Sequence, residues 1–316
     1  MYEEIAGRDG FTLVIANPRS GRGRGGRTAD DLSKSLEKRG VRAAVFVTGR
    51  RGDAVRRSAS FAAQANKDGF RGRVVVIGGD GTVNEVVNGI SGTGIGLTVL
   101  AAGTGNIVAR EFGLPRTVDS AADAAAWGRE IRVDVGVFGK RAFVCVASAG
   151  FDAEVARLYG KERSAATGYF EYVHPFTKSL LDYRLPRLSV EIDGVLAGAP
   201  VSWLLASNTR MYGASAVFCD DADPADGFLD VVSMGVKSTL ESVPYFLLSL
   251  AGQFSMAPGV RRVRAKQVNF RPVEGPVPVQ LDGDFAGFCT DSRPGVIFVR
   301  EKALTIVAPS PEGGRS

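Results

Sequence analysis

The sequence predicts two domains with a ligand cleft between them: an α/β N-terminal domain with a parallel sheet, and a β-rich antiparallel C-terminal domain. The chain has 316 residues, more than one hydrophobic core usually supports. Up to residue 134, short apolar runs alternate with helical patterns, which is typical of a parallel sheet covered on both faces. Beyond it, alternating apolar and polar residues with Asp-Gly turns indicate antiparallel strands.

The first domain is expected to cover residues 1–134, with the C-terminal segment 303–316 packing back on it. Gly40 and Gly69 mark the ends of two helices, and Asp53 is expected to be an N-cap. The expected strands are 11–16, 43–47, 73–77 and 97–100, and the expected helices are 28–39, 53–68, 83–90, 107–112 and 118–127.

The second domain is expected to cover residues 135–302 and to bind the second substrate. The turn signal Asp193-Gly194 predicts a hairpin between strands 188–192 and 201–205. Further strands are expected at 229–233, 263–270, 277–281 and 296–299, with helical inserts at 153–182 and 238–253.

The composition excludes several kinds of site. Cys145, Cys219 and Cys289 form no C-x-x-C pair, so we expect reduced thiols in a cytoplasmic protein. The single histidine, His174, leaves no material for a Ser-His-Asp triad or a multi-histidine metal site. The apolar run 243–251 is too short to span a membrane. If the protein associates with a membrane, we expect peripheral binding to the inner face of that membrane.

The positive charge is concentrated in the first domain. Residues 1–134 carry 20 Lys and Arg against 15 Asp and Glu, whereas residues 135–316 carry 19 of each, so the net charge of +5 lies in the first part. Such a surplus attracts nucleotide phosphates or anionic lipid, and we expect no nucleic-acid partner.

The first of three glycine-rich loops has two interpretations, one as a P-loop in which Arg27 replaces the phosphate-binding lysine and one as a dinucleotide site. Gly21, Gly23 and Gly26 form G-x-G-x-x-G between a strand and a helix, the pattern of a dinucleotide site. The usual acidic ribose ligand is missing and Arg50 and Arg51 stand near its place, so this interpretation predicts an NADP-dependent oxidoreductase. At this point it stays an open alternative.

The second loop is more specific. Strand 73–77 leads into Gly78-Gly79-Asp80-Gly81-Thr82-Val83-Asn84-Glu85, which then continues as a helix. Glycines let backbone N–H groups approach phosphate oxygens, and the helix N-terminus adds a favourable dipole. Asp80 would repel phosphate unless a cation lay between them, which predicts Mg²⁺ bound with the nucleotide.

With this loop the chain resembles the diacylglycerol kinase catalytic domain family, which includes bacterial lipid kinases and sphingosine and ceramide kinases. That family is distantly similar to NAD kinases and phosphofructokinases, so the resemblance implies a Rossmann-like first domain of that kind. Asn17-Pro18-Arg19-Ser20-Gly21 resembles its N-P-x-S-G opening, Thr48 with Gly52-Asp53-Ala54 its T-x-x-x-G-D-A segment, and Ala102-Gly103-Thr104-Gly105-Asn106 its third nucleotide loop. The implied ATP contacts are Asn17, Ser20, Thr48, Gly78, Gly79, Asp80, Gly81, Thr82, Val83, Asn84, Gly103, Thr104 and Asn106.

Two acidic motifs extend the resemblance into the second domain. The run 223–230 resembles the D-G-x-L-D segment, which implies Mg²⁺ held by the Asp226 carboxylate and the carbonyls of Asp223 and Phe228; a plain turn is the alternative. Asp282-Gly283-Asp284 falls where relatives have Asp-Gly-Glu, so Asp284 is implied to be the catalytic base; a simple hairpin turn is the alternative.

Glu85 and Asp134 are further candidates, for carboxylates on the substrate side. The resemblance implies an ATP-dependent lipid kinase that phosphorylates a lipid hydroxyl, with diacylglycerol, giving phosphatidic acid, ranked first. A sphingoid base or another lipid is the alternative, since Gly105-Asn106-Ile107 is closer to sphingosine-kinase-like members. A regulatory nucleotide- or lipid-binding protein without catalysis is a further alternative.

The lipid acceptor is expected to be met at a membrane surface. The segment 158–187 mixes aromatic and basic residues, which suits either an interfacial helix or a helix packed on its own domain. Homodimerisation is left open.

Overall fold

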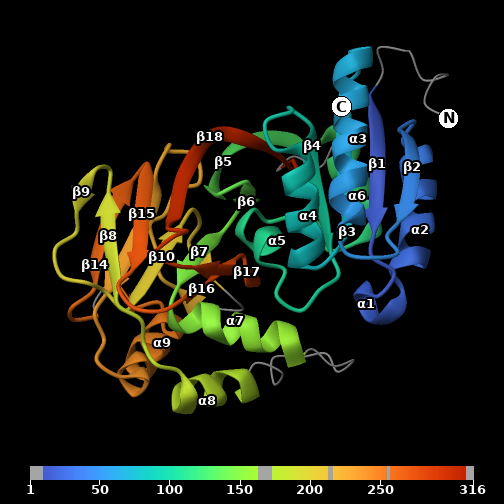
Figure 1. Cartoon of the computed structure of the whole chain (residues 1–316). Coiled ribbons are helices and arrows are strands. Elements are labelled where there is room, and N and C mark those ends of the chain that lie inside the picture. Colours follow the sequence, from blue (N-terminus) through green and yellow to red (C-terminus); the bar gives the residue numbers. More distant parts are fainter. Residues whose placement is uncertain (1–9, 163–172, 213–215, 255–256, 311–316) are drawn as a thin grey trace. The chain divides into compact units, whose positions relative to one another are not determined.

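The computed structural model describes residues 10–162, 173–212, 216–254 and 257–310 (Figure 1). The chain divides into two compact units, one formed by residues 1–133 with 302–316 and the other by residues 134–301. Within the described residues, no helix is both long and apolar enough to cross a membrane.

Unit 1 is built on parallel strands in the order β2-β1-β3-β4, followed by the end of β18. Val14 of β1 pairs with Val45 of β2 and with Val75 of β3. Every residue of β1 and β3 is buried, because helices cover both faces of the sheet. The strands are β1 (Phe11–Ala16), β2 (Arg42–Val47), β3 (Gly72–Gly78), β4 (Gly96–Ala101) and β18 (Gly295–Ala308).

Alternate residues of β1 face different helices. Val14 packs with Leu32 and Leu36 of α2 in one core cluster, to which α6 also contributes, whereas Phe11 contacts Phe61 of α3. Gly89 of α4 lies directly on α3, since a Cβ there would stand 2.0 Å from Ser58 Oγ. The helices are α1 (Ser20–Gly23), α2 (Gly25–Glu37), α3 (Asp53–Asp68), α4 (Asp80–Ile90), α5 (Ile107–Glu111) and α6 (Val118–Trp127).

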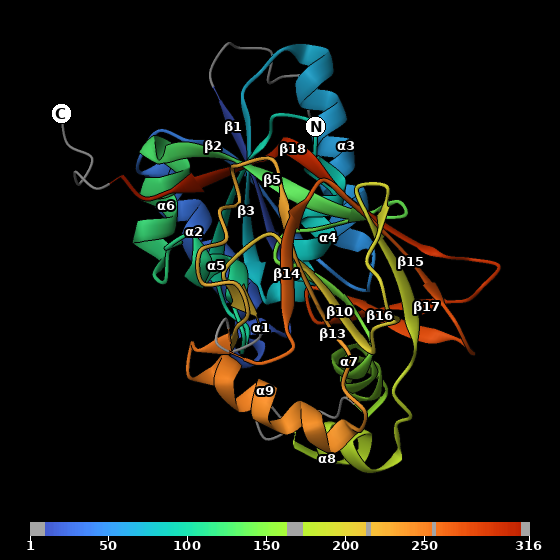
Figure 2. The same ribbon diagram turned by 90° about the vertical axis from the view of Figure 1, so that its left-hand side faces the viewer.

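Unit 2 encloses its core between two groups of antiparallel strands (Figure 2). One sheet has the order β14-β13-β10-β7-β16-β17, and in the other β15 pairs with β8 and the beginning of β18. The six strands of the first sheet are β7 (Val146–Ala149), β10 (Trp203–Ser207), β13 (Leu229–Met234), β14 (Arg261–Ala265), β16 (Val277–Leu281) and β17 (Asp284–Cys289). The others are β5 (Arg129–Phe138), β6 (Arg141–Phe143), β8 (Leu188–Ile192), β9 (Val195–Leu196), β11 (Met211–Tyr212), β12 (Ala216–Val217) and β15 (Gln267–Pro272).

Two strand predictions in unit 2 were wrong. The expected strand 263–270 is interrupted at Lys266, so that β14 and β15 belong to different sheets. The expected hairpin between 188–192 and 201–205 is reduced to one antiparallel bridge between Leu188 and Val201. Instead, β8 pairs with β9 across the Asp193 turn, and β10 lies in the other sheet. Both sheets face one core, so a period-two pattern continues across the break and does not reveal it.

Several helix boundaries also differ from the expectation. Helix α2 begins at Gly25 rather than at residue 28. Asp53 is the first residue of α3, and the N-cap is Gly52, which adopts a left-handed φ of 86°. The two inserts contain α7 (Phe151–Glu162), α8 (Val173–Asp182), the 3₁₀ helix η2 (Thr239–Glu241) and α9 (Ser242–Leu250), and residues 163–172 lie outside the described part.

Candidate functional site

The three glycine-rich loops meet at the carboxyl end of the parallel sheet in unit 1. Gly21 N donates to Ala102 O at 2.9 Å, and Ala102 N donates to Gly78 O at 3.1 Å. Thr48, after β2, is tied to the same edge because its N–H donates to Ala16 O at 2.9 Å. The expected ATP contacts, drawn from four separate segments, are thereby brought together.

Glycine is required where the second and third loops touch. A Cβ built on Gly103 would stand 2.6 Å from the Cα of Gly79, and a Cβ on Gly78 would stand 2.8 Å from Cβ of Thr82. A side chain at Gly103 would push the two loops apart, and one at Gly78 would displace Thr82 within the second loop. The bare backbone leaves N–H groups near the surface, which is the arrangement that phosphate binding needs.

Asp80 joins the second loop to the third. Its Oδ1 accepts a hydrogen bond from Ile107 N at 2.7 Å, and a Cβ on Gly105 would stand 2.7 Å from its Oδ2. The third loop is closed by Asn106, whose left-handed backbone lets its side chain accept from Gly103 N at 2.9 Å and donate to Gly103 O at 2.7 Å. The Asp80 carboxylate therefore holds the third loop in place, whatever else it binds.

The expected ATP contacts differ in what they can offer a ligand. Thr82, Val83 and Asn84 are buried, so Val83 and Asn84 act through the fold and the helix N-terminus. Asn17 holds the first loop: its Nδ2 donates to Thr82 Oγ1 at 3.3 Å, and its Oδ1 accepts from Arg19 N at 3.0 Å. The exposed members of the set are Gly81, Gly103 and Thr104, and the half-buried ones include Ser20, Thr48, Gly79 and Asp80.

Glu85, a substrate candidate, has a structural task. Its Oε1 accepts from Gly52 N at 2.9 Å, and its Oε2 accepts from Ala54 N at 3.2 Å. These amides lie at the beginning of α3, where backbone N–H groups lack partners within the helix. Glu85 of α4 therefore caps α3, and this accounts for the carboxylate without a substrate.

Asp134, the other substrate candidate, is buried in unit 2. Its Oδ2 accepts from Gly227 N at 2.7 Å, and its backbone N–H donates to Pro224 O at 2.6 Å. Both partners belong to the acidic loop 223–228, for which the sequence suggested a metal. Asp134 therefore anchors that loop from the inside.

The acidic loop pairs its carboxylate with a cation of the protein. Asp226 accepts from Phe228 N at 2.9 Å through Oδ1, and its Oδ2 forms an ion pair with Arg264. The Arg264 guanidinium and the Lys266 ammonium lie 4.8 Å and 5.4 Å from the centroid of the Phe228 ring. Mg²⁺ needs negatively charged or carbonyl oxygens without competing cations. As arranged, the expected ligands Asp223, Asp226 and Phe228 do not fit a Mg²⁺ site.

The part of the chain that the structure describes offers no other metal cluster in its place. Among the described residues, no group of three or more His, Cys, Asp or Glu side chains is placed to hold a metal ion.

The Asp282-Gly283-Asp284 turn connects β16 and β17 and is held from two sides. Asp282 adopts a left-handed φ of 50°, and its carboxylate accepts from the backbone amides of Val144, Cys145 and Val146 at 2.8–3.0 Å. Gly283 N donates to Gln280 Oε1 at 2.7 Å. The strands on either side of the turn, β16 and β17, pair as a hairpin. Asp284 is the first residue after the turn and is half-buried.

A buried polar network behind this turn was not expected from the sequence. Gln280 Nε2 donates to Ser148 Oγ at 2.8 Å, and Ser148 in turn hydrogen-bonds Asp152. Trp203 Nε1 and Tyr212 OH also donate to Asp152, at 2.6 Å and 2.8 Å. Burial raises the pKa of Asp152, and these hydrogen bonds offset part of that rise. The partners are distant in sequence, so no local pattern marks them.

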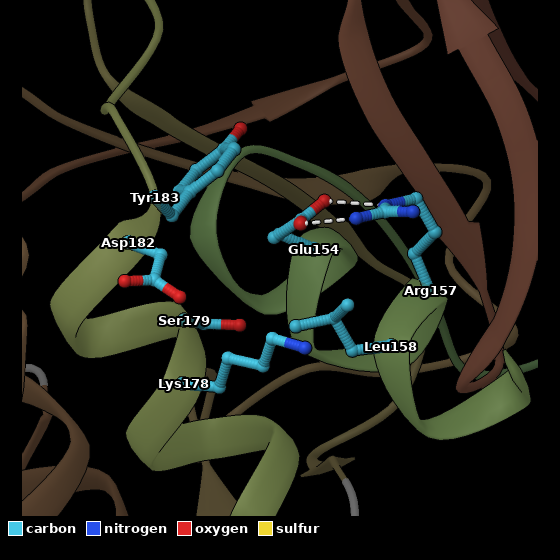
Figure 3. Close-up of a pocket in the computed structure, with 7 residues that line it drawn as sticks. All are labelled: Glu154, Arg157, Leu158, Lys178, Ser179, Asp182 and Tyr183. Carbon is cyan, nitrogen blue, oxygen red and sulfur yellow. Dashed lines mark hydrogen bonds and ion pairs between the residues drawn. The ribbon is translucent and has the colours of Figure 1, made fainter. Parts of the chain in front are cut away.

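A pocket of about 390 Å³ lies between α7 and α8 (Figure 3). Glu154 accepts from Arg157 Nε at 2.7 Å and Nη2 at 2.6 Å, and this pair lines one side. Ser179 Oγ is buried in the pocket wall without a hydrogen-bond partner. Burial, and then the nearby Glu154 carboxylate, raise the pKa of Tyr183 above its ordinary range. The remaining lining residues are Leu158, Lys178 and Asp182.

This pocket falls in the segment 158–187, for which two interpretations were open. The described part of the segment packs on its own unit: the rings of Phe151 in α7 and Phe176 in α8 lie 5.6 Å apart in an edge-to-face contact. Three of the five aromatic residues that suggested an interfacial helix lie outside the described residues: Tyr169, Phe170 and Tyr172.

Two family models together match most of the chain. Residues 12–138 match the family model of the diacylglycerol kinase catalytic domain, and residues 145–308 match that of the YegS C-terminal NAD kinase beta sandwich-like domain. A diacylglycerol kinase of Mycobacterium tuberculosis is 32% identical over 285 residues, covering 88% of this chain and 89% of the relative. One from Staphylococcus carnosus is 29% identical over 279 residues, covering 87% and 88%.

Solved structures show the same architecture. A diacylglycerol kinase structure from Bacillus anthracis aligns with a TM-score of 0.71 at 18% identity, covering 96% of this chain and 98% of that one. Yeast NADH kinase in complex with NADH aligns at 0.51 with 10% identity, covering 96% and 84%, and shows a shared fold alone. An α/β unit with three meeting glycine loops, joined to a β sandwich, therefore defines a kinase of the NAD-kinase-like fold.

Within that class, the chain belongs to the diacylglycerol kinase family. The predicted family, fold class and enzyme class are thereby confirmed.

Proposed function

We propose that this enzyme is an ATP-dependent lipid kinase that transfers the γ-phosphate of ATP to the free hydroxyl of diacylglycerol, giving phosphatidic acid. The observation that supports this most is the junction of three glycine loops at one sheet edge, fastened by the Asp80–Ile107 hydrogen bond. The relatives from M. tuberculosis and S. carnosus are named diacylglycerol kinases, which favours that acceptor over a sphingoid base.

The nucleotide half of the reaction belongs to unit 1. The backbone amides around Gly79, Gly81 and Gly103 and the N-terminus of α4 would bind phosphate oxygens. Asp80 would hold the Mg²⁺ that is bound with the nucleotide, and this ion would neutralise charge on the phosphates. The contact would run through water, because Mg²⁺ gives up its hydration reluctantly. Phosphoryl transfer depends mainly on such positioning and charge neutralisation.

The acceptor half belongs to unit 2. Asp284 would take the proton from the lipid hydroxyl while the oxygen of that hydroxyl attacks the γ-phosphorus of ATP. ADP is then the leaving group. Aspartate has one methylene less reach than the glutamate usual in relatives, so its placement must be exact to within a hydrogen-bond length. The hydrogen bonds of Asp282 and Gln280 hold the turn before Asp284, which supports this role.

A transfer assay tests this function. Purified enzyme, [γ-³²P]ATP and Mg²⁺ are mixed with vesicles that contain dioleoylglycerol, sphingosine or ceramide, and lipids are separated after extraction. Labelled phosphatidic acid from the dioleoylglycerol vesicles is expected. Label in sphingosine phosphate alone would reassign the acceptor, and no labelled lipid would contradict the proposal. Thermal shifts with NADPH in place of ATP test the oxidoreductase alternative.

A further inference from the structure

Helix α9 buries both of its serines and exposes two of its three leucines. Ser242 and Ser249 are 1% and 0% exposed, whereas Leu247 and Leu250 are 59% and 46% exposed. A surface helix normally directs its apolar residues to the core and its polar residues to water. The helix contains no charged residue. Tyr245 packs against a core cluster of unit 2, whereas the two exposed leucines are not used by that core.

The neighbouring elements α8 and η2 also expose leucines. Thr239 Oγ1 in η2 donates to Leu180 O in α8 at 2.6 Å, and the rings of Phe176 in α8 and Phe246 in α9 lie 5.2 Å apart. Figures 1 and 2 both show α8 and α9 side by side. Each element adds one exposed leucine, Leu181 at 82% and Leu240 at 65%. We call Leu181, Leu240, Leu247 and Leu250 the leucine patch.

The size of the leucine patch favours a lipid surface over a protein partner. A nine-residue helix is roughly 14 Å long. A stable protein interface needs about 800 Å² on each partner, more than one short helix and two further leucines present. An apolar helix face can instead insert shallowly among lipid headgroups, where a small area suffices if charges assist.

The charges of the segments that bear the patch suit anionic lipid. The segments that bear it, 173–187 and 235–254, contain four basic residues against two acidic ones, a net charge of +2. Anionic headgroups attract such a surplus within a Debye length of the membrane. The basic residues are Lys178, Arg184, Arg187 and Lys237, and the acidic ones are Asp182 and Glu241.

We propose that the leucine patch docks unit 2 on the surface of an anionic bilayer, from which the acceptor lipid is drawn. This inference rests on the proposed lipid kinase function and names the surface that serves it. Docking orients the enzyme, whereas the chemical step uses the glycine loops and Asp284, so the two can be separated by experiment.

The test measures co-sedimentation with vesicles of phosphatidylcholine with and without phosphatidylglycerol, and phosphorylation of dihexanoylglycerol, which dissolves in water. The variant Leu247→Glu/Leu250→Glu is compared with Leu196→Glu, an exposed leucine (62%) on β9 outside the patch. Leu240→Glu, in η2, is a second independent variant. Melting temperatures confirm that each variant is folded.

We expect the wild type and Leu196→Glu to bind anionic vesicles equally, and both patch variants to bind at least about tenfold more weakly. All four proteins should phosphorylate dihexanoylglycerol equally. Unchanged vesicle binding in the patch variants would overturn the inference, as would a wild-type dimer that the patch variants dissociate in light scattering. If no acylglycerol is phosphorylated but the patch variants still lose vesicle binding, the proposed function fails and the docking surface stands.

Discussion

The Asp80 carboxylate accepts a hydrogen bond from the backbone N–H of Ile107 at 2.7 Å, and this bond joins the second glycine loop to the third. In a phosphate site, a carboxylate has two reasons to be present. It can hold the loops, as this bond does, and it can attract the cation that accompanies the nucleotide. Substitutions at Asp80 can separate these roles.

Asp80→Asn keeps an oxygen for Ile107 N but removes the negative charge. We expect nearly wild-type stability and a loss of Mg²⁺-ATP binding of roughly tenfold or more, since the charge-assisted interaction is gone. Asp80→Ala should in addition lower the free energy of unfolding by about 1 kcal/mol, because Ile107 N loses its partner. Calorimetric titration and denaturant unfolding measure both effects, with Asp30→Asn on α2 as the surface control. Unchanged nucleotide affinity in Asp80→Asn would leave Asp80 a structural role alone.

Gln280 should act on the reaction through the turn that it holds. Gln280→Leu leaves Gly283 N without its acceptor, so the turn before Asp284 loosens, and we expect kcat to fall while KM for ATP stays unchanged. Ser202→Ala is the matched control: it removes a buried hydroxyl that bonds Val236, away from the turn. Both variants should lose about 1–3 kcal/mol of stability. An equal effect of the two variants on kcat would show that Gln280 is merely structural.

Arg264 should compete with divalent cations for the acidic loop. In the wild type the Asp226 carboxylate is paired with Arg264, so we expect Mg²⁺ or its removal by EDTA to leave the melting temperature unchanged. Arg264→Ala frees the carboxylate, and millimolar Mg²⁺ should then raise the melting temperature of this variant. Lys266→Ala, which leaves the ion pair intact, is the control. A stabilisation of the wild type by Mg²⁺ would show that the metal displaces Arg264.

The buried cysteines predict a dependence on alkaline pH. Burial raises the pKa of Cys219 to about 12 and that of Cys289 to about 11. The unfolded chain therefore loses these protons first, and the free energy of unfolding should decline as pH rises from about 9 towards 11, with the full stabilisation present below that range. We expect no fast reaction of either thiol with Ellman's reagent at pH 8 until denaturant is added. Rapid labelling of the native protein would contradict this.

The sequence predicts best where structure depends on neighbouring residues. The bounds of α3 and α6 agree with the expectation, and the loop from Gly78 to Glu85 was found because a strand, glycines and a helix follow each other directly. Roles that depend on distant partners could not be predicted. Glu85 and Asp134 were recognised as notable carboxylates, but their tasks became clear only from the backbone amides that they bind.

The polar network of Asp152 shows the same limit. Its partners Trp203 and Gln280 lie 51 and 128 residues away, and nothing in the residues next to Asp152 indicates either contact. The exposure of Leu247 and Leu250 in α9 could not be predicted either, because an apolar run has the same sequence pattern whether it is buried or exposed.

The central claim is that the glycine loops deliver the γ-phosphate and Asp284 accepts the lipid proton. Its most direct test is the initial rate of [³²P]phosphatidic acid formation from dioleoylglycerol by the wild type, Asp284→Asn and Asp284→Glu, with Mg²⁺-ATP affinity measured in parallel. We predict a fall in kcat of roughly 100-fold or more for Asp284→Asn, partial or full recovery for Asp284→Glu, and unchanged nucleotide affinity throughout. A wild-type rate in Asp284→Asn, or no transfer to any acylglycerol by the wild type, would contradict the account.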